Sequence, residues 1–278
     1  MKKAMVMLLA VTGFLFYTSS LFAEEKKPEK PWNRFDVNLG ASWILNDSEV
    51  RLGGEGAGVA ISPEEVLGLD ADTTVFRSDG NWRFTRNLRH SLDFTWYSNR
   101  RKGQTDAAPQ TIEIGDITIN EGDSVKASLD LDVIRVGYSY SFFQDDRMDL
   151  AVGGGLYIMP IVFKVESNGV VQGNISESFT APLPVLSLRA DFAITPKWFL
   201  RNRIDAFYLE YDNFTGAIVD TKMALEWEAF KHFGFGVAWD NFRMKAEAED
   251  DTSVPGADFL GTFKFQNAGF MLYLKGYF

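Results

Sequence analysis

The sequence predicts an all-β chain that crosses a membrane as an antiparallel up-and-down β-barrel of about ten strands, with 8 or 12 strands as the alternatives. Two observations predict this fold. Apolar residues recur at every second position in about ten short segments that polar connections separate. After residue 23, no apolar segment reaches the roughly 18 residues of a spanning helix. A membrane chain without such helices must close its sheet, because open sheet edges cannot exist in hydrocarbon.

The amino terminus is predicted to be a secretory signal. Lys2 and Lys3 precede an apolar run at 4–16 that is too short to cross a bilayer as a helix, and Ala23 offers a small residue for cleavage. The charged, proline-containing segment that follows is typical of a short exposed tail. The predicted organisation is a signal peptide at 1–23, a periplasmic tail at 24–31 and an outer-membrane β-barrel at 32–278.

Composition excludes several classes of function. The formal net charge is −10, and loss of Lys2 and Lys3 with the signal makes it −12. Such an acidic chain is not expected to bind nucleic acid, because phosphate recognition needs a basic surface. The absence of cysteine excludes disulfides, thiol catalysis and thiolate metal sites. We expect no cofactor.

The ten predicted strands all alternate between an apolar face for lipid and a polar face for the lumen. In the last strand, Phe270, Leu272 and Leu274 alternate with Tyr273 and Lys275. A soluble β-sandwich also alternates, but here the polar face pairs Arg with Asp on several strands, as a crowded lumen would. The predicted strands lie at 35–43, 76–84, 91–97, 129–142, 148–158, 186–194, 198–208, 219–227, 233–240 and 268–278.

One predicted strand changes phase along its length. Leu129 and Leu131 are out of phase with Val136 and the residues after it, which predicts a β-bulge near Val133. Tryptophans near the ends of the predicted strands are typical of interfacial girdles. These are Trp43, Trp96, Trp198, Trp227 and Trp239.

The connections alternate in length, as a barrel with both termini on one side requires. Short turns are predicted at 85–89, 144–147, 195–197 and 229–232, and would be periplasmic. Longer loops are predicted at 46–73, 101–124, 167–180 and 247–257, with a short exception at 211–216. The loop at 46–73 holds seven carboxylates and one base, which indicates an acidic extracellular surface.

The carboxyl terminus carries the most specific pattern. Phe270, Leu272, Leu274 and the terminal Phe278 lie at alternate positions, with Gly276 as a departure. This ending resembles the closing strand of Gram-negative outer-membrane β-barrels. The resemblance implies a location in the outer membrane of a Gram-negative bacterium, folding by the barrel-assembly machinery, and contact with outer-membrane lipid and lipopolysaccharide.

The charges predicted to face the lumen form the main candidate site. Bases and acids are equal in number, so they can neutralise one another. A ten-strand barrel is near the size that side chains can fill, which favours a salt-bridged plug over the alternative, a narrow solute channel. The predicted lumen charge network contains Asp36, Arg77, Asp79, Arg83, Asp93, Arg135, Asp149, Arg189, Asp191, Arg201, Arg203, Asp205, Lys222, Glu226, Asp240 and Lys275.

Catalysis is not predicted. Outer-membrane lipases, lipid A-modifying enzymes and omptin proteases use a histidine, but His90 and His232 both fall near predicted periplasmic turns. The strand number resembles that of omptins, whose paired-acid and His-Asp pattern cannot be placed here. Acidic loop residues such as Glu249 and Asp258 could hold divalent cations, although no calcium-loop motif is present and we predict no metal site.

The predicted function is therefore a structural or surface-binding outer-membrane barrel with a charge-filled lumen. The alternatives are a porin-like channel for small solutes and an outer-leaflet enzyme that works without histidine.

Overall fold

The computed structural model describes residues 31–52, 60–109, 111–114, 117–167, 173–211, 214–248 and 261–278. The predicted signal peptide and nearly all of the predicted tail lie outside these residues. Within them, no helix is long and apolar enough to cross a membrane. The elements are β1 (Phe35–Leu52), α2 (Pro63–Val66), β2 (Asp72–Arg83), β3 (His90–Thr105), β4 (Ile112–Ile114), β5 (Ile117–Ile119), β6 (Val125–Gln144), β7 (Met148–Ser167), β8 (Gly173–Ala193), β9 (Trp198–Tyr211), β10 (Phe214–Trp227), β11 (Phe233–Ala248) and β12 (Gly261–Tyr277).

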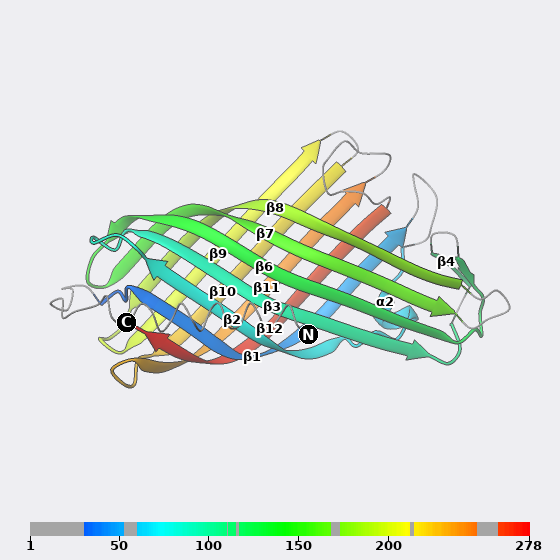
Figure 1. Cartoon of the computed structure of the whole chain (residues 1–278), viewed down its shortest axis with the longest axis horizontal. Coiled ribbons are helices and arrows are strands. Elements are labelled where there is room, and N and C mark those ends of the chain that lie inside the picture. Colours follow the sequence, from blue (N-terminus) through cyan, green and yellow to red (C-terminus); the bar gives the residue numbers. More distant parts are fainter. Residues whose placement is uncertain are drawn as a thin grey trace, which may run out of the picture. The chain divides into compact units, whose positions relative to one another are not determined.

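Ten of the strands form one closed antiparallel barrel, as the sequence predicted (Figure 1). The barrel closes because β1 pairs with β2 on one side and with β12 on the other. The remaining strands, β4 and β5, form a separate two-stranded sheet in the connection between β3 and β6.

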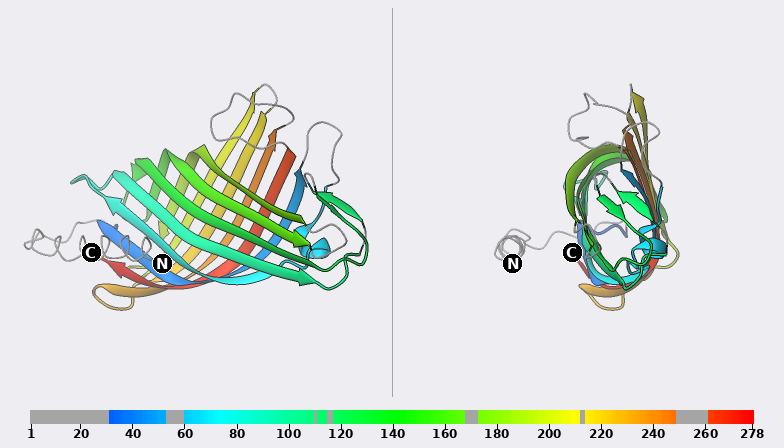
Figure 2. Two further views of the ribbon diagram at one scale, coloured as in Figure 1. Left: turned by 45° about the vertical axis from the view of Figure 1, so that its right-hand side comes forward. Right: turned by 90° about the vertical axis from the view of Figure 1, so that its right-hand side faces the viewer.

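The predicted short turns all lie at one end of the barrel, between β2 and β3, β6 and β7, β8 and β9, and β10 and β11. The carboxyl terminus is at this end too, where the Phe278 carbonyl oxygen accepts a hydrogen bond of 2.9 Å from the Arg34 N–H. Short turns are periplasmic in this class of barrel. The opposite end, which carries α2 and the β4–β5 sheet, is therefore the outer end (Figure 2).

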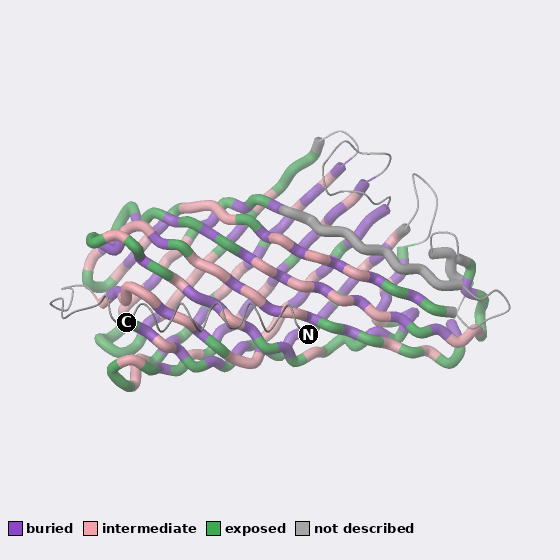
Figure 3. The backbone as a smooth tube through the Cα atoms, viewed as in Figure 1, coloured by how far each residue is buried: buried purple, intermediate pink, exposed green. Residues whose placement is uncertain are grey.

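The half of the barrel next to the short turns has an apolar exterior, which we call the belt. Large side chains such as Leu225, Val237 and Leu272 face outward there and are exposed. In the belt, exposed residues alternate with more buried ones along the strands, so that lipid would meet one face and the lumen the other (Figure 3). At the periplasmic edge, Trp198 and Trp227 stack with ring centroids 5.8 Å apart.

Several strands extend further than predicted. In the outer half of the barrel the two faces of each strand exchange character, so that polar residues point outward and apolar residues point inward. Beyond the belt, polar residues such as Lys264 and Glu49 point outward, while Phe263 and Phe265 point into the barrel and are buried. Period two is retained, so the chain remains a strand. The predicted loops at 46–73, 101–124 and 167–180 are wrong in part, since β1 runs to Leu52, β3 to Thr105 and β8 starts at Gly173.

The predicted bulge near Val133 is wrong for the same reason. Pairing of β6 with β3 runs through Val133 without a shift of register, and Leu129, Leu131 and Val133 are all lumen-facing and buried. These apolar residues mark the height at which the lumen-facing side of β6 changes from charged to apolar. The register shift in β6 lies instead between Ser141 and Phe143, near the periplasmic end.

The inverted halves enclose an apolar layer, which we call the outer core. It contains lumen-facing side chains of the strands together with Val66, Leu67 and Leu69 of the α2 segment and Ile119 of β5. These segments of the outer connections pack into the mouth of the barrel. The strand residues of the outer core include Ile44, Val75, Leu129, Leu131, Val133, Ile161, Phe163, Ile218, Phe242, Met244, Phe263 and Phe265.

The segment around α2 is fixed to the wall by a polar contact. Ser62 caps α2, accepting a hydrogen bond from the Glu65 N–H. Glu64 forms an ion pair with the buried Arg101 of β3. Arg101 also donates a 2.6 Å hydrogen bond to the Ser48 hydroxyl of β1. This contact joins the α2 segment to two strands.

Candidate functional site

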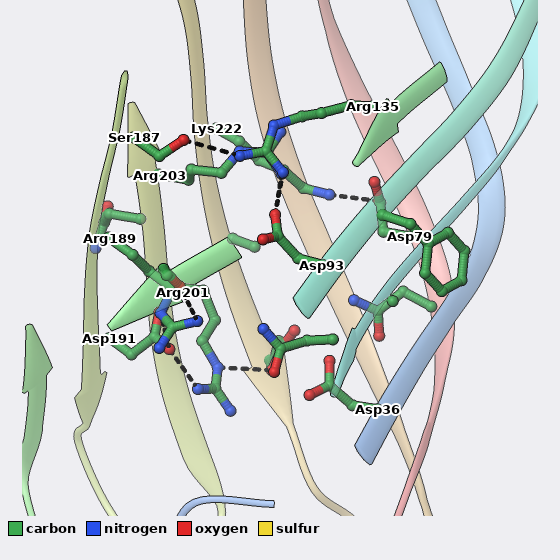
Figure 4. Close-up of a pocket in the computed structure, with 18 of the residues that line it drawn as sticks. Asp36, Asp79, Asp93, Arg135, Ser187, Arg189, Asp191, Arg201, Arg203 and Lys222 are labelled. Atoms are coloured by element: carbon green, nitrogen blue, oxygen red, sulfur yellow. Dashed lines mark hydrogen bonds and ion pairs between the residues drawn. The ribbon is translucent and has the colours of Figure 1, made fainter. Parts of the chain in front are cut away.

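The lumen of the membrane-spanning half is lined by charged side chains that converge from many strands (Figure 4). The alternation of each strand points every second residue inward, and closure of the barrel brings together residues that are far apart in sequence. They form three clusters, and ion pairs and hydrogen bonds connect the side chains within each cluster.

The first cluster, nearest the periplasmic end, begins with two arginines that share two aspartates. Arg83 lies 3.2 Å from Asp149 and 3.2 Å from Asp191. Arg189 reaches the same carboxylates at 3.3 and 3.5 Å. Arg83 and Asp149 are almost completely buried, with 1% and 0% of their side chains exposed. Such burial requires that each charge has a close counter-ion.

The first cluster continues across the barrel to the closing strand. Arg201 lies 2.9 Å from Asp191 and 3.2 Å from Glu226. The ammonium of Lys275 is buried and donates to Glu226 at 2.6 Å and to Glu228 at 3.0 Å. The chain of contacts therefore links β2, β7, β8, β9, β10 and β12 at one height.

The second cluster centres on Asp205, which is fully buried. Arg135 approaches it with two nitrogens at 2.5 and 3.0 Å, a bidentate contact that fixes the guanidinium. Arg135 also pairs with Asp93 and donates to the Ser187 hydroxyl at 3.0 Å. This arginine thus connects β6 to β3, β8 and β9.

The second cluster extends to Asp220 on β10. Arg203 lies 3.0 Å from Asp220 and 3.3 Å from Asp205. The hydroxyl of Tyr157 contacts Asp205 at 2.9 Å and Asp220 at 2.5 Å. Two neighbouring carboxylates are therefore held apart by one guanidinium and one phenol.

The third cluster joins β2 and β3 to β10 and β11. Arg77 contacts Asp79 at 3.2 Å and Asp240 at 3.0 Å. Asp79 also accepts from Lys222 at 2.5 Å and from the Thr95 hydroxyl at 2.7 Å. The structure thus brings all of the predicted lumen charges together except one.

The exception is Asp36. Its side chain is buried, with 8% of the residue exposed, and among the described residues it makes no direct hydrogen bond or ion pair, although the charges of Lys275 and Arg201 act on it from a greater distance. It lines a cavity of about 110 Å³ whose wall also includes residues of all three clusters, such as Arg83, Arg135 and Lys222. Figure 4 shows its carboxylate apart from the contacts of the three clusters. Polar cavities of this kind are suited to water molecules.

Sequence reasoning missed part of this network. Asp220 and Tyr157 complete the second cluster, and both stand at lumen-facing positions of predicted strands, so the alternation itself could have identified them. Glu64 and Arg101 were missed because both were placed in loops. The partners of each charge could not be predicted, since they depend on the register around the whole barrel.

The two histidines lie at the periplasmic end. His90 Nδ1 lies 2.7 Å from the hydroxyl of Tyr138, and the His232 ring stacks on Phe278 with centroids 5.0 Å apart. Among the described residues, no group of histidines and carboxylates has the geometry of a metal site. The acidic segment that contains Glu249 and Asp258 lies outside the described residues.

The residues of the predicted assembly signal all face outward. Phe270, Leu272 and Leu274 are 59%, 54% and 59% exposed in the belt, and Phe278 is 62% exposed at its periplasmic edge. The N–H of Phe278 donates to the Phe35 carbonyl, which holds the last residue against the first strand.

Comparison with known proteins shows the fold. No protein-family model and no curated protein match the chain. The outer membrane protease OmpT from Escherichia coli superposes with a TM-score of 0.52 at 10% identity, covering 91% of this chain and 99% of OmpT. The transport unit of the autotransporter AIDA-I from Escherichia coli gives a TM-score of 0.39 at 12% identity, with 93% and 94% covered. The attachment invasion locus protein Ail of Yersinia pestis gives 0.36 at 8% identity, with 87% and 98% covered.

At such identities the likeness concerns the fold and not the activity. The closed barrel of ten antiparallel strands, the apolar belt and the likeness to OmpT agree with one another. The chain has the fold of the Gram-negative outer-membrane β-barrels, and the outer membrane is its location.

Proposed function

We propose that the protein is a non-conducting outer-membrane barrel that presents a binding surface outside the cell. The observation that carries this proposal is that side chains occupy the lumen at two heights. The three charge clusters occupy the membrane half, and the outer core occupies the half above it. Barrels of about eight strands are filled by their side chains, whereas aqueous channels need about sixteen.

The two layers resist ions for different reasons. In the charge clusters, moving an ion through would require separating buried pairs such as Arg83 and Asp149. In the outer core, apolar side chains such as Phe163 and Leu129 offer an ion no polar partner. Either layer alone would lower conductance, and together they support a closed lumen.

The proposed surface role rests on the length of the strands. A tilted strand needs about 9–11 residues to cross a bilayer, whereas β6 and β7 have 20 residues each and β8 has 21. The excess forms a rigid wall outside the membrane. Its exterior is polar and partly ion-paired, as in the contacts of Arg100 with Asp130 and Asp132.

We also propose that the protein is not a histidine-dependent hydrolase. His90 and His232 lie beside the periplasmic turns, at the end opposite to extracellular substrates. A general base must come within hydrogen-bonding reach of its substrate. The purified protein is expected to leave phospholipid, lipid A and peptide substrates unchanged in mass spectrometric assays.

Conductance in planar bilayers tests the closed lumen. Wild-type protein is expected to give very small or no single-channel currents, while a porin in the same bilayer shows that the assay works. A large, stable, ion-selective current from wild-type protein would replace this proposal with the channel.

The surface role needs a separate experiment. The protein in lipid nanodiscs is incubated with a defined panel of polysaccharides and soluble proteins. Binding is expected to weaken when the exposed Lys126 and Lys164, in the outer parts of β6 and β7, are changed to Glu. The matched control changes Arg86 and Lys197, which are exposed at the periplasmic turns. Equal loss in both variants would contradict a binding surface at the outer end.

A further inference from the structure

The wall of the barrel is interrupted between β8 and β9. Their ladder ends at the pair Leu186↔Ala206. Above this pair, β8 continues along β7 to the pair Ser167↔Gly173, and β9 continues along β10 to the pair Phe214↔Tyr211. In the part of the chain that the structure describes, each strand therefore has one unpaired edge above this pair, and the two strands diverge toward the outer end (Figures 1 and 2).

The sequence explains why the ladder ends there. The N–H of Ala193 donates to the carbonyl of Arg147, the residue just before β7, and the carbonyl of Ala190 accepts a hydrogen bond from the side-chain amide of Asn202 on β9. Since the backbone groups of a strand alternate between its two neighbours, even-numbered residues of β8 face β9. Pro182 and Pro184 are even-numbered and have no N–H to donate. Two successive N–H groups that β8 would donate to β9 are thus missing directly above the last pair.

The interruption opens the outer core. Leu209 of β9 is lumen-facing by its pairing with Gly216, yet it is 39% exposed. Phe207, also lumen-facing, packs against the outer core and is only partly buried. On the closed part of the wall, the lumen-facing Phe263 and Phe265 are only 5% and 2% exposed. The described lumen-facing side chains at the opening, Phe207 and Leu209, are apolar.

The opening lies at the outer edge of the belt. Leu186, in the last pair of the β8–β9 ladder, points outward and is 77% exposed. Tyr208, one outward position above Ala206, is 66% exposed and donates to Glu210 at 2.7 Å. Exposed aromatic side chains such as that of Tyr208 are typical of the boundary between hydrocarbon and headgroups. The base of the opening is thus at the height of outer-leaflet lipid.

We propose that this opening is a lateral binding site for an acyl chain of an outer-leaflet lipid, which enters between β8 and β9 and contacts Phe207, Leu209 and the outer core. The charge clusters below close the lumen toward the periplasm, so an apolar ligand reaches the site from the leaflet. A strand of another protein fits less well, because the two prolines remove the hydrogen bonds that such a strand would need.

Photo-crosslinking tests the site without altering the protein. Wild-type protein is reconstituted with a phospholipid that carries a diazirine near the middle of its acyl chain, irradiated, and mapped by mass spectrometry. The lumen-facing Phe207 and Leu209 are expected to carry several times more label than the lumen-facing Phe263 and Phe265. Label confined to outward-facing residues such as Leu225 would overturn the proposal.

A variant that closes the opening provides the second readout. Replacing Pro182 and Pro184 by Val restores two donors, so the β8–β9 ladder can extend and label on Leu209 is expected to fall severalfold. Label on the outward-facing Leu225 should stay constant, which also reports that the variant is folded. Unchanged label on Leu209 despite slowed amide exchange at Tyr208 would count against entry through this opening. A second copy seated there, seen as a dimer in detergent, would also exclude the lipid.

Discussion

The ring of Tyr273 occupies the space that a side chain at position 236 would fill. A Cβ on Gly236 would lie 2.1 Å from the Cζ of Tyr273, so the lumen accepts the ring only because residue 236 is glycine. The hydroxyl of Tyr273 then reaches Glu226 at 3.0 Å. Gly236→Ala is expected to destabilise the barrel by about 1–3 kcal/mol through overpacking.

The matched control is Gly276→Ala on the outward face of β12. A Cβ there would approach nothing closer than the Val37 carbonyl oxygen at 4.0 Å. This variant is expected to unfold at the urea concentration of wild type or slightly above it. If both glycine variants lost the same stability, the cost would come from the strand backbone and not from Tyr273.

The lumen charges differ in how strongly they depend on partners. Asp191 contacts Arg83, Arg189 and Arg201, so Asp191→Asn should cost about 3–5 kcal/mol by leaving buried cations without their counter-ion. Asp36 has no such contact, and Asp36→Asn should be neutral or stabilising. Unfolding in denaturant compares the two, and an equal loss would show that Asp36 is engaged as closely as Asp191.

The belt can be tested on a single face of one strand. Leu225 and Thr215 both point outward on β10, Leu225 in the belt and Thr215 near the outer end. Leu225→Arg should cost about 2–4 kcal/mol if its position is near the bilayer midplane, whereas Thr215→Arg should cost almost nothing. Similar costs measured in lipid vesicles would contradict the assigned depth.

The terminal residue is expected to act in assembly. Deleting Phe278 removes an exposed aromatic side chain and its contacts with Phe35 and His232. The folded fraction in outer-membrane extracts, measured by heat-modifiable electrophoresis, is expected to fall. Phe230→Ala is the control, because Phe230 is 65% exposed at the same end but lies in a turn. Equal losses would point to general hydrophobicity and not to a terminal signal.

The contact between Glu64 and Arg101 is expected to hold the α2 segment in the mouth of the barrel. Glu64→Gln leaves the buried guanidinium of Arg101 without its carboxylate, which should speed amide exchange at Val66, Leu67 and Leu69. Exchange in β10 should not change. Glu65→Gln, on the neighbouring and exposed residue of α2, serves as the control.

The membrane half of the fold was predictable because the alternation of apolar and polar residues can be read from neighbours in the sequence. Leu225 and Glu226 are adjacent, and their opposite faces follow directly from period two. The outer half obeys the same period with its faces exchanged, as Phe263 and Lys264 show, and no neighbouring residue tells where the bilayer ends. This is why the strands were predicted too short and Leu129 was taken to indicate a bulge.

The candidate site was predictable as a set of residues but not as a set of contacts. Each inward charge follows from its own strand, whereas the pairing of Arg83 with Asp191 joins β2 to β8 across the lumen. That pairing depends on strand number and register. The opening between β8 and β9 was missed because the region before Pro182 was predicted to be a loop, although the two prolines were visible in the sequence.

The exchange of faces between the two halves also divides the thermodynamics of the barrel. In the outer half, folding removes Phe263, Met244 and their neighbours from water. Such burial carries a large heat-capacity change, so the stabilisation that it provides weakens on cooling. In the membrane half, the outward-facing apolar side chains contact lipid and not water, so folding gains little from removing them from water. Ion pairs hold the interior of this half, and they lack the heat-capacity change of apolar burial. Cold should therefore loosen the outer half first, while the portion within the bilayer keeps its structure.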